Sequence, residues 1–115
     1  MSFIDSIFPM PALVGAIFTV VGCIMFLFPP KKINPLYGYR TARSMKNQEQ
    51  WDFAQLYSSK LLMFCGVILA CLSLLGFVID LTNDTEAILS TILIIGLVIL
   101  LVVKTEKAIK TKFNG

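Results

Sequence analysis

Long apolar blocks alternate with polar segments along this chain of 115 residues. The apolar blocks cover about residues 10–28, 61–79 and 87–103, and none of them contains an acidic or basic residue. A helix needs roughly 20 apolar residues to cross a bilayer, and a lysine at mid-span costs about 3 kcal/mol. The pattern therefore predicts an all-α protein with three transmembrane helices, forming a single membrane domain over residues 1–115.

The basic residues are confined to two of the four polar segments. All ten basic residues lie in segments 29–60 and 104–115, whereas the other two polar segments carry only Asp5, Asp80, Asp84 and Glu86. The positive-inside rule then predicts a multi-pass protein of the bacterial cytoplasmic (inner) membrane, with its N-terminus outside and its C-terminus in the cytoplasm. Because the basic residues follow topology and face anionic lipid, the net charge of +3 does not call for a nucleic-acid partner.

Segment 29–60, here called the motif loop, has the most varied chemistry. Turn signals at Asn34-Pro35 and Gly38 mark its first half. Its second half lacks glycine and proline, which predicts an amphipathic helix that begins near Met45 and is capped by Thr41 or Ser44. The helical wheel gathers an apolar side and an opposite polar side: Met45, Phe53, Leu56, Tyr57 and Leu61 against Gln48, Asp52, Gln55 and Ser59.

Two interpretations of this helix are open. In one, Trp51, Asn47 and Arg40 meet in a polar-aromatic binding site, since Arg40 offers a planar fork suited to a carboxylate or a lipid phosphate. In the other, the helix lies flat among the lipid headgroups and leads into the second span. The sequence favours neither a separate helix nor one continuous with that span.

The same residues carry a family resemblance. The run Tyr37-Gly38-Tyr39-Arg40-Thr41 and the positions around it resemble the signature of the SdpI family of small bacterial membrane proteins, which is named for an immunity protein against a secreted peptide toxin. The matching positions are Asn34, Tyr37, Gly38, Tyr39, Arg40, Thr41, Ser44, Asn47 and Trp51. The resemblance extends roughly from the first span through the second. It implies a helical membrane fold with the motif loop between two helices, and a role in protection from a membrane-active toxin, in some members coupled to holding a transcriptional repressor at the membrane.

Other candidate sites are weak. The chain has no histidine, and Cys23, Cys65 and Cys71 are interpreted as packing residues within the spans. Glu49 and Asp52 are expected to form surface ion pairs with the neighbouring Lys46 and Arg43. We therefore expect no catalytic residues, no metal site and no cofactor, and the protein is not predicted to be an enzyme.

Small residues form stripes on two of the spans. Gly15, Thr19 and Cys23 repeat every four residues in the first, and Gly66, Ala70 and Ser73 form a similar stripe in the second. Such stripes let helices approach closely, either within the monomer, which is favoured, or in a homo-oligomer. The third span, rich in Ile, Leu and Val, is expected to face lipid or a partner.

Two functions remain in competition. The first is a membrane-embedded binding protein of immunity or signalling type, whose motif loop contacts a peptide toxin, a regulator or lipid. The second is a small accessory subunit that stabilises or docks a larger membrane protein. The bilayer is a partner in both.

Overall fold

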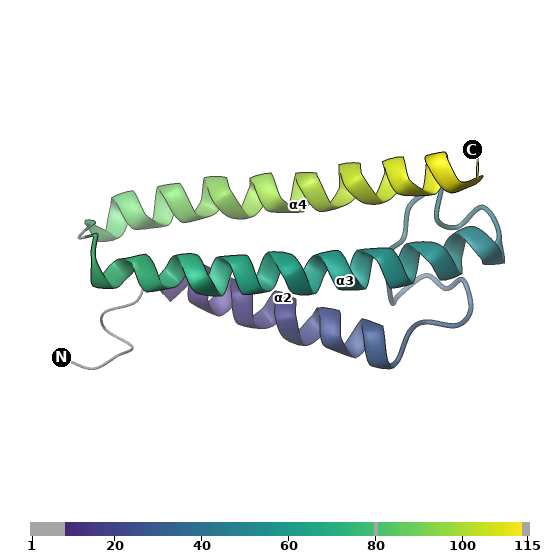
Figure 1. Ribbon diagram of the computed structural model, residues 1–115, viewed down its shortest axis with the longest axis horizontal. Coiled ribbons are helices and arrows are strands. Elements are labelled where there is room, and N and C mark those ends of the chain that lie inside the picture. Colours follow the sequence, from purple (N-terminus) through teal and green to yellow (C-terminus); the bar gives the residue numbers. More distant parts are fainter. Residues whose placement is uncertain (1–8, 80, 114–115) are drawn as a thin grey trace.

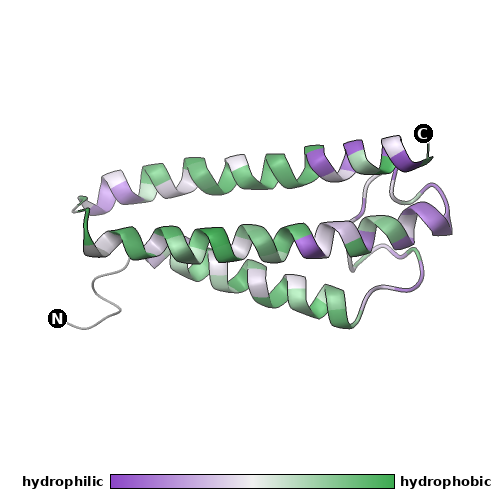
Figure 2. Ribbon diagram, in the orientation of Figure 1, coloured by the Kyte–Doolittle hydropathy of each residue, from purple (hydrophilic) through white to green (hydrophobic). Residues whose placement is uncertain are grey.

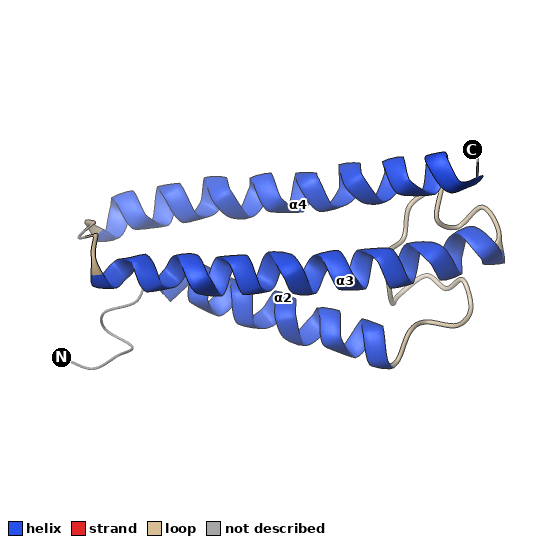
Figure 3. Cartoon of the chain, viewed as in Figure 1, coloured by secondary structure: helices blue, strands red, loops and turns tan. Residues whose placement is uncertain are grey.

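Three long helices form an elongated bundle of 51 × 24 × 21 Å. The computed structural model describes residues 9–79 and 81–113, which contain helices α2 (Pro9–Leu27), α3 (Gln48–Ser73) and α4 (Asn83–Phe113) and a 3-10 turn, η1 (Leu74–Phe77). No strand occurs within these residues (Figure 3). All three helices are long and apolar enough to cross a membrane, which confirms the predicted all-α, three-span architecture.

Helix α3 lies between the other two (Figure 1). It packs most extensively on α2 and less on α4, whereas α2 and α4 touch little. Because the chain reverses twice, segment 28–47, which connects α2 to α3, lies at the same end of the bundle as the end of α4. We call this segment the connecting segment. Hydrophilic residues gather at this end of both α3 and α4 (Figure 2).

Local chemistry explains where the helices begin and end. Pro29 and Pro30 come one residue after the end of α2 and cannot extend its hydrogen-bond ladder. The Thr82 Oγ1 accepts from the Thr85 N–H at 3.2 Å and so caps the start of α4. Asp84 and Glu86 then lie in the first turn of α4 and Lys110 and Lys112 in the last, as the helix dipole favours.

The start of α3 differs from the prediction. Asn47 caps this helix, with an extended φ of −156° and its side chain accepting from the Gln50 N–H at 2.8 Å. Thr41 and Ser44 instead bond each other's backbone N–H groups and close an isolated turn. From Gln48 onward, α3 is continuous with the second span, so no separate helix lies in the headgroups.

The orientation of the first turns of α3 also differs from the prediction. Leu56, assigned to the apolar side, is 48% exposed, whereas Trp51, Ala54, Gln55 and Ser59 are all buried. The reason is that a membrane helix gains nothing from turning leucine away from lipid, while small and polar residues allow close contact and hydrogen bonds. Helix α3 therefore packs through its small and polar side.

The two small-residue stripes pack against each other within the monomer. A Cβ added to Gly15 would lie 2.8 Å from the backbone of both Gly66 and Ala70, and one added to Gly22 would lie 2.9 Å from the Met63 backbone nitrogen. The favoured intramolecular alternative is thus confirmed. Cys23, from the same stripe, donates to the Met63 Sδ at 3.4 Å, and all three cysteines are free thiols.

Helix α4 is the most exposed of the three. Only 11% of its most apolar stretch is buried inside the bundle, against 28% of the corresponding stretch of α3. Its last turns, which contain the basic residues, are held to α3 by an edge-to-face contact between Phe53 and Phe113 at 5.7 Å and by Lys112 over the Phe53 ring at 4.8 Å. The apolar middle of α4 is therefore available to lipid.

We predict that Gly66→Ala destabilises the protein by about 1–3 kcal/mol, because overpacking forces two backbones apart. The new methyl group would collide with the Thr19 Oγ1 and lie 2.6 Å from the Thr19 backbone nitrogen. Unfolding by SDS in mixed micelles, followed by circular dichroism, measures the change. Gly96→Ala is the matched control, since nothing lies within 4 Å of that position. Equal midpoints for the two variants would contradict the close α2–α3 contact.

Candidate functional site in the connecting segment

The first half of the connecting segment is folded by Asn34. Its Oδ1 accepts from the Leu36 and Tyr37 N–H groups at 3.0 and 2.7 Å, and its Nδ2 donates to the Lys32 carbonyl at 2.9 Å. These bonds form the Asx turn that the Asn-Pro pair indicates. The Tyr37 hydroxyl donates to the Phe28 carbonyl at 2.8 Å, which ties the turn back to the end of α2.

Gly38 allows the segment to approach α3. Its φ is +104°, and a Cβ there would lie 2.5 Å from the Gln55 Oε1 and 2.7 Å from Pro30. Directly after it, the Tyr39 N–H donates to the Gln55 Oε1 at 2.7 Å and the Tyr39 carbonyl accepts from the Gln55 Nε2 at 2.8 Å. The buried glutamine thus satisfies both backbone groups of Tyr39, as a neighbouring strand would.

Three further side chains of α3 bond backbone carbonyls of the segment. The fully buried Trp51 donates from Nε1 to the Pro30 carbonyl at 2.6 Å. The Gln50 Nε2 donates to the Arg43 carbonyl at 2.7 Å, and the Gln48 Nε2 to the Lys31 carbonyl at 2.5 Å. Together these three bonds fix the path of the chain over the first two turns of α3, and the buried one, from Trp51, satisfies a carbonyl that would be costly without a partner.

Glu106 holds the segment from the other side. From α4, its Oε2 accepts from the Tyr39 hydroxyl at 2.8 Å and from the Thr41 hydroxyl at 2.9 Å. Its Oε1 lies 3.7 Å from the Arg43 Nε. The carboxyl group therefore joins three residues of the segment to a helix that lies more than sixty positions away in the chain.

Sequence reasoning missed Glu106. The sequence does contain a signal for it: Glu106 is the single acidic residue among the four lysines after residue 103. A tail that only sets the membrane topology does not require an acidic residue. Arg43, expected beside Glu49 and Asp52, lies next to Glu106 instead. Asp52 accepts from the Gln48 Nε2 at 2.7 Å.

Burial and the neighbouring Glu106 raise the pKa of the Tyr39 hydroxyl well above its ordinary value of 10. Loss of the charged form's hydration is the larger cause, followed by the hydrogen bond to Glu106 and its negative charge. Tyr39 therefore remains a proton donor to Glu106 throughout the physiological range.

The motif residues thus have different roles. Asn34, Gly38, Ser44, Asn47 and Trp51 shape or anchor the backbone, and the hydrogen bonds of Asn47, Trp51 and Arg40 go to three different partners. Ser44, which is fully buried, donates to the Tyr39 carbonyl at 3.1 Å. The anticipated cluster of Trp51, Asn47 and Arg40 is replaced by a network that supports the segment from within.

Some side chains of the segment face outward. Arg40 is exposed and donates from Nε to the Asn34 carbonyl at 3.0 Å, while Leu36 is 91% exposed. Tyr37 is 37% exposed, and Lys31 and Lys32 are also exposed. We call these five residues the outer surface. It combines positive charge with apolar groups on a backbone that the bonds described above hold in place.

The chain is similar to known proteins of one family. The model of the SdpI/YfhL protein family matches residues 31–105, which run from the connecting segment through most of α4 rather than from the first span through the second. A protein of Bacillus subtilis (strain 168) named "Uncharacterized protein YfhL" is 38% identical over 96 residues, 84% of this chain and 82% of its own length. No solved structure matches the chain.

We predict that Glu106→Ala loosens the connecting segment, because it removes the carboxylate that accepts from the Tyr39 and Thr41 hydroxyl groups. An unsatisfied buried polar group costs about 1–3 kcal/mol, so trypsin should cleave after Arg40 and Arg43 roughly tenfold faster or more. Peptide mass spectrometry of the detergent-solubilised protein measures the rates. Glu49→Ala is the control, since Glu49 is exposed on the first turn of α3. Equal rates in the two variants would show that Glu106 does not hold the segment.

The raised pKa of Tyr39 predicts the response to alkali. A group whose pKa is higher in the folded state contributes stability below its unfolded value of 10 and loses it as the pH rises beyond that value. Phenolate absorbance in the near ultraviolet should therefore show one tyrosine that ionises at a higher pH than an ordinary tyrosine, whose pKa is roughly 10. This late step should be missing in Tyr39→Phe. Its persistence there would assign it to another tyrosine.

Proposed function

The chain belongs to the SdpI/YfhL protein family, and on this premise we propose that it is a membrane-embedded binding protein of the immunity or signalling type. The outer surface of the connecting segment is the binding site in this proposal. The ligand is a peptide toxin or a regulator that carries acidic and apolar groups, or an anionic lipid.

The observation that carries the proposal is the preorganised backbone beneath the outer surface. Side chains from α3 bond four of the segment's residues, and Glu106 on α4 bonds one of these again, Tyr39, and also Thr41. Much of the cost of binding comes from ordering loops and side chains, and a segment already held in one conformation avoids that cost. A segment that served only to link two spans would not need such support.

The distribution of charge indicates which side of the membrane the site faces and which kind of partner it binds in this proposal. Nine of the ten basic residues belong to the connecting segment or to the last ten residues of α4 at the same end of the bundle, and the tenth, Lys60, lies midway along α3. By the positive-inside rule, this end faces the cytoplasm of a bacterium, and the N-terminus lies outside. Arg40, Lys31 and Lys32 then attract an acidic partner, while Leu36 supplies an apolar contact.

The proposed role is binding rather than catalysis. The carboxyl group next to the segment, Glu106, accepts from two hydroxyls and lies beside Arg43, so it serves to hold the loop. Within the described residues, no group of three or more potential metal ligands occurs.

An accessory subunit of a larger membrane complex is the second candidate. It is favoured by the exposed apolar face of α4, where Ile92, Ile95 and Ile99 are each more than half exposed and Gly96 has open space before it. A glycine beside exposed branched residues suits packing against another helix as well as against lipid.

We predict that Arg40→Ala removes the protective function and leaves the protein folded. Arg40 is exposed and bonds only to the segment itself, so its loss removes a charge from the outer surface. Cells that produce the chain are challenged with a panel of secreted peptide toxins, and survival and protein level are measured. Lys46→Ala removes the same charge from an exposed position outside the outer surface and should preserve survival. Trp51→Ala should instead lower the protein level, because Trp51 is fully buried.

Full protection by Arg40→Ala would refute the outer surface as the binding site. Purification in mild detergent separates the two candidate functions. A larger membrane protein that co-purifies in equal amount with both Arg40→Ala and the parent chain would support the accessory role and overturn the binding role.

A further inference from the structure

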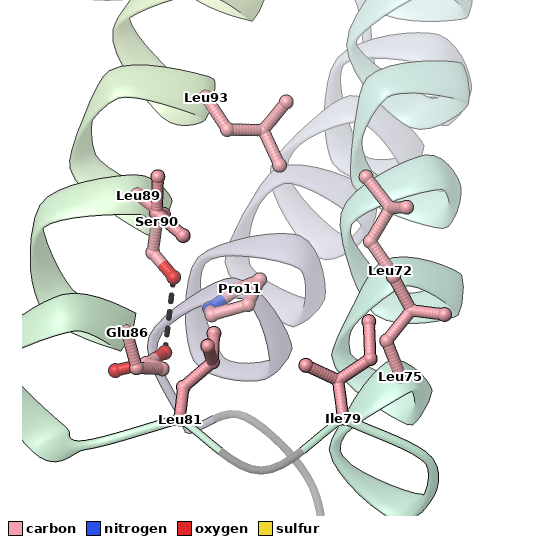
Figure 4. A pocket seen from close by; sticks show the side chains of 9 residues that line it. All are labelled: Pro11, Leu72, Leu75, Ile79, Leu81, Glu86, Leu89, Ser90 and Leu93. Atoms are coloured by element: carbon pink, nitrogen blue, oxygen red, sulfur yellow. Dashed lines mark hydrogen bonds between the residues drawn. The ribbon is translucent and has the colours of Figure 1, made fainter.

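An apolar cavity lies at the end of the bundle opposite the connecting segment (Figure 4). It measures about 250 Å³ and lies between the start of α2, the end of α3 with η1, and the start of α4. Its walls are almost entirely apolar, formed among others by Pro11, Leu72, Leu75, Leu89 and Leu93.

One acidic group lines this apolar cavity. Glu86 is only 8% exposed, and its Oε1 accepts from the hydroxyl of Ser90, itself 6% exposed, at 2.9 Å (Figure 4). Burial of a carboxyl group among leucines is costly, and one neutral hydroxyl offsets little of that cost. The position in the first turn of α4 adds a modest favourable interaction with the helix dipole.

The chain supplies no lysine or arginine for Glu86. None occurs before Lys31 or between residues 61 and 103. Among the described residues, the other charge near the start of α4 is the exposed Asp84, which is also acidic. The complement to this end of the protein is therefore a positive charge from outside the chain.

We propose that this cavity binds a single-chain amphiphile with a cationic head group. The head group pairs with Glu86, and the hydrocarbon chain lies among the leucines toward Leu93, which is seven positions and thus about 10 Å further along α4. The cavity is close to the lower limit of small-molecule sites, roughly 300–1,000 Å³, which suits one narrow chain better than a two-chain phospholipid.

This site is independent of the outer surface. It uses none of the motif residues and lies at the other end of α3, so either proposal can fail without the other. Under the proposed topology it takes its ligand from the outer leaflet, where membrane-active cations enter.

Photolabelling tests the proposal. The full chain in phosphatidylcholine vesicles is exposed to a long-chain alkylamine that carries a diazirine in its tail, or to the alcohol with the same tail. Peptide mass spectrometry then measures the labelling of residues 72–93. A charge-assisted hydrogen bond favours the amine roughly tenfold or more over the alcohol. Glu86→Gln should reduce amine labelling to the level of the alcohol. Asp84→Asn, the same change at an exposed neighbour, should leave the amine's preference intact.

Competition on the parent protein provides a second measurement that does not depend on the folding of a variant. An unreactive alkyltrimethylammonium should displace the labelled amine, and an alkyl alcohol at equal concentration should not. Equal labelling by amine and alcohol, or equal displacement by the two competitors, would identify the cavity as a site for ordinary acyl chains and overturn the proposal. A preference for the amine that survives in Glu86→Gln would overturn it as well.

Discussion

The close contact between α2 and α3 is the constraint on which the rest of the molecule depends. Glycines at 15 and 66 bring the two backbones together, and Gly22 continues the contact toward the other end of the bundle. Within a bilayer, apolar burial does not drive helices together, so close packing must supply that attraction. By fixing where α2 ends against α3, the contact brings the Pro30 carbonyl within reach of the Trp51 indole.

From that point, hydrogen bonds to the backbone determine the path of the connecting segment. Glutamine is well suited to this task because its amide both donates and accepts, as Gln55 does for Tyr39. The arrangement requires α4 as well, since Glu106 receives the hydroxyls of Tyr39 and Thr41. The connecting segment thus packs as an element of its own between α3 and α4. Its conformation depends on all three spans being in place.

The sequence predicted what depends on composition and local spacing. Charge-free length predicted the three helices, and the spacing of small residues predicted the two stripes that contain Gly15 and Gly66. It was wrong about which side of α3 is buried near Trp51, because amphipathic reasoning assumes water on one side, whereas here the alternatives are lipid and a polar loop. It also missed Glu106, whose partners are 65 and 67 positions away and leave no periodic trace. The cap of α3 lies at Asn47 rather than at Ser44. Both residues can close a similar local turn, and the hydrogen bond from Gln50 to the Arg43 carbonyl favours the cap at Asn47.

The two carboxyl groups on α4 show how differently the ends of one helix can be used. Glu106 accepts from two hydroxyls and lies beside an arginine, so its position is explained by the fold alone. Glu86 is more deeply buried and accepts from one serine, in a cavity lined by leucines. If packing were all that mattered, a leucine at position 86 would continue the apolar wall of that cavity and remove the cost of burying a carboxyl group. The fold therefore accounts in full for Glu106, whereas for Glu86 the helix dipole and Ser90 offset only part of the cost of burial, and the proposed cation supplies the remaining interaction.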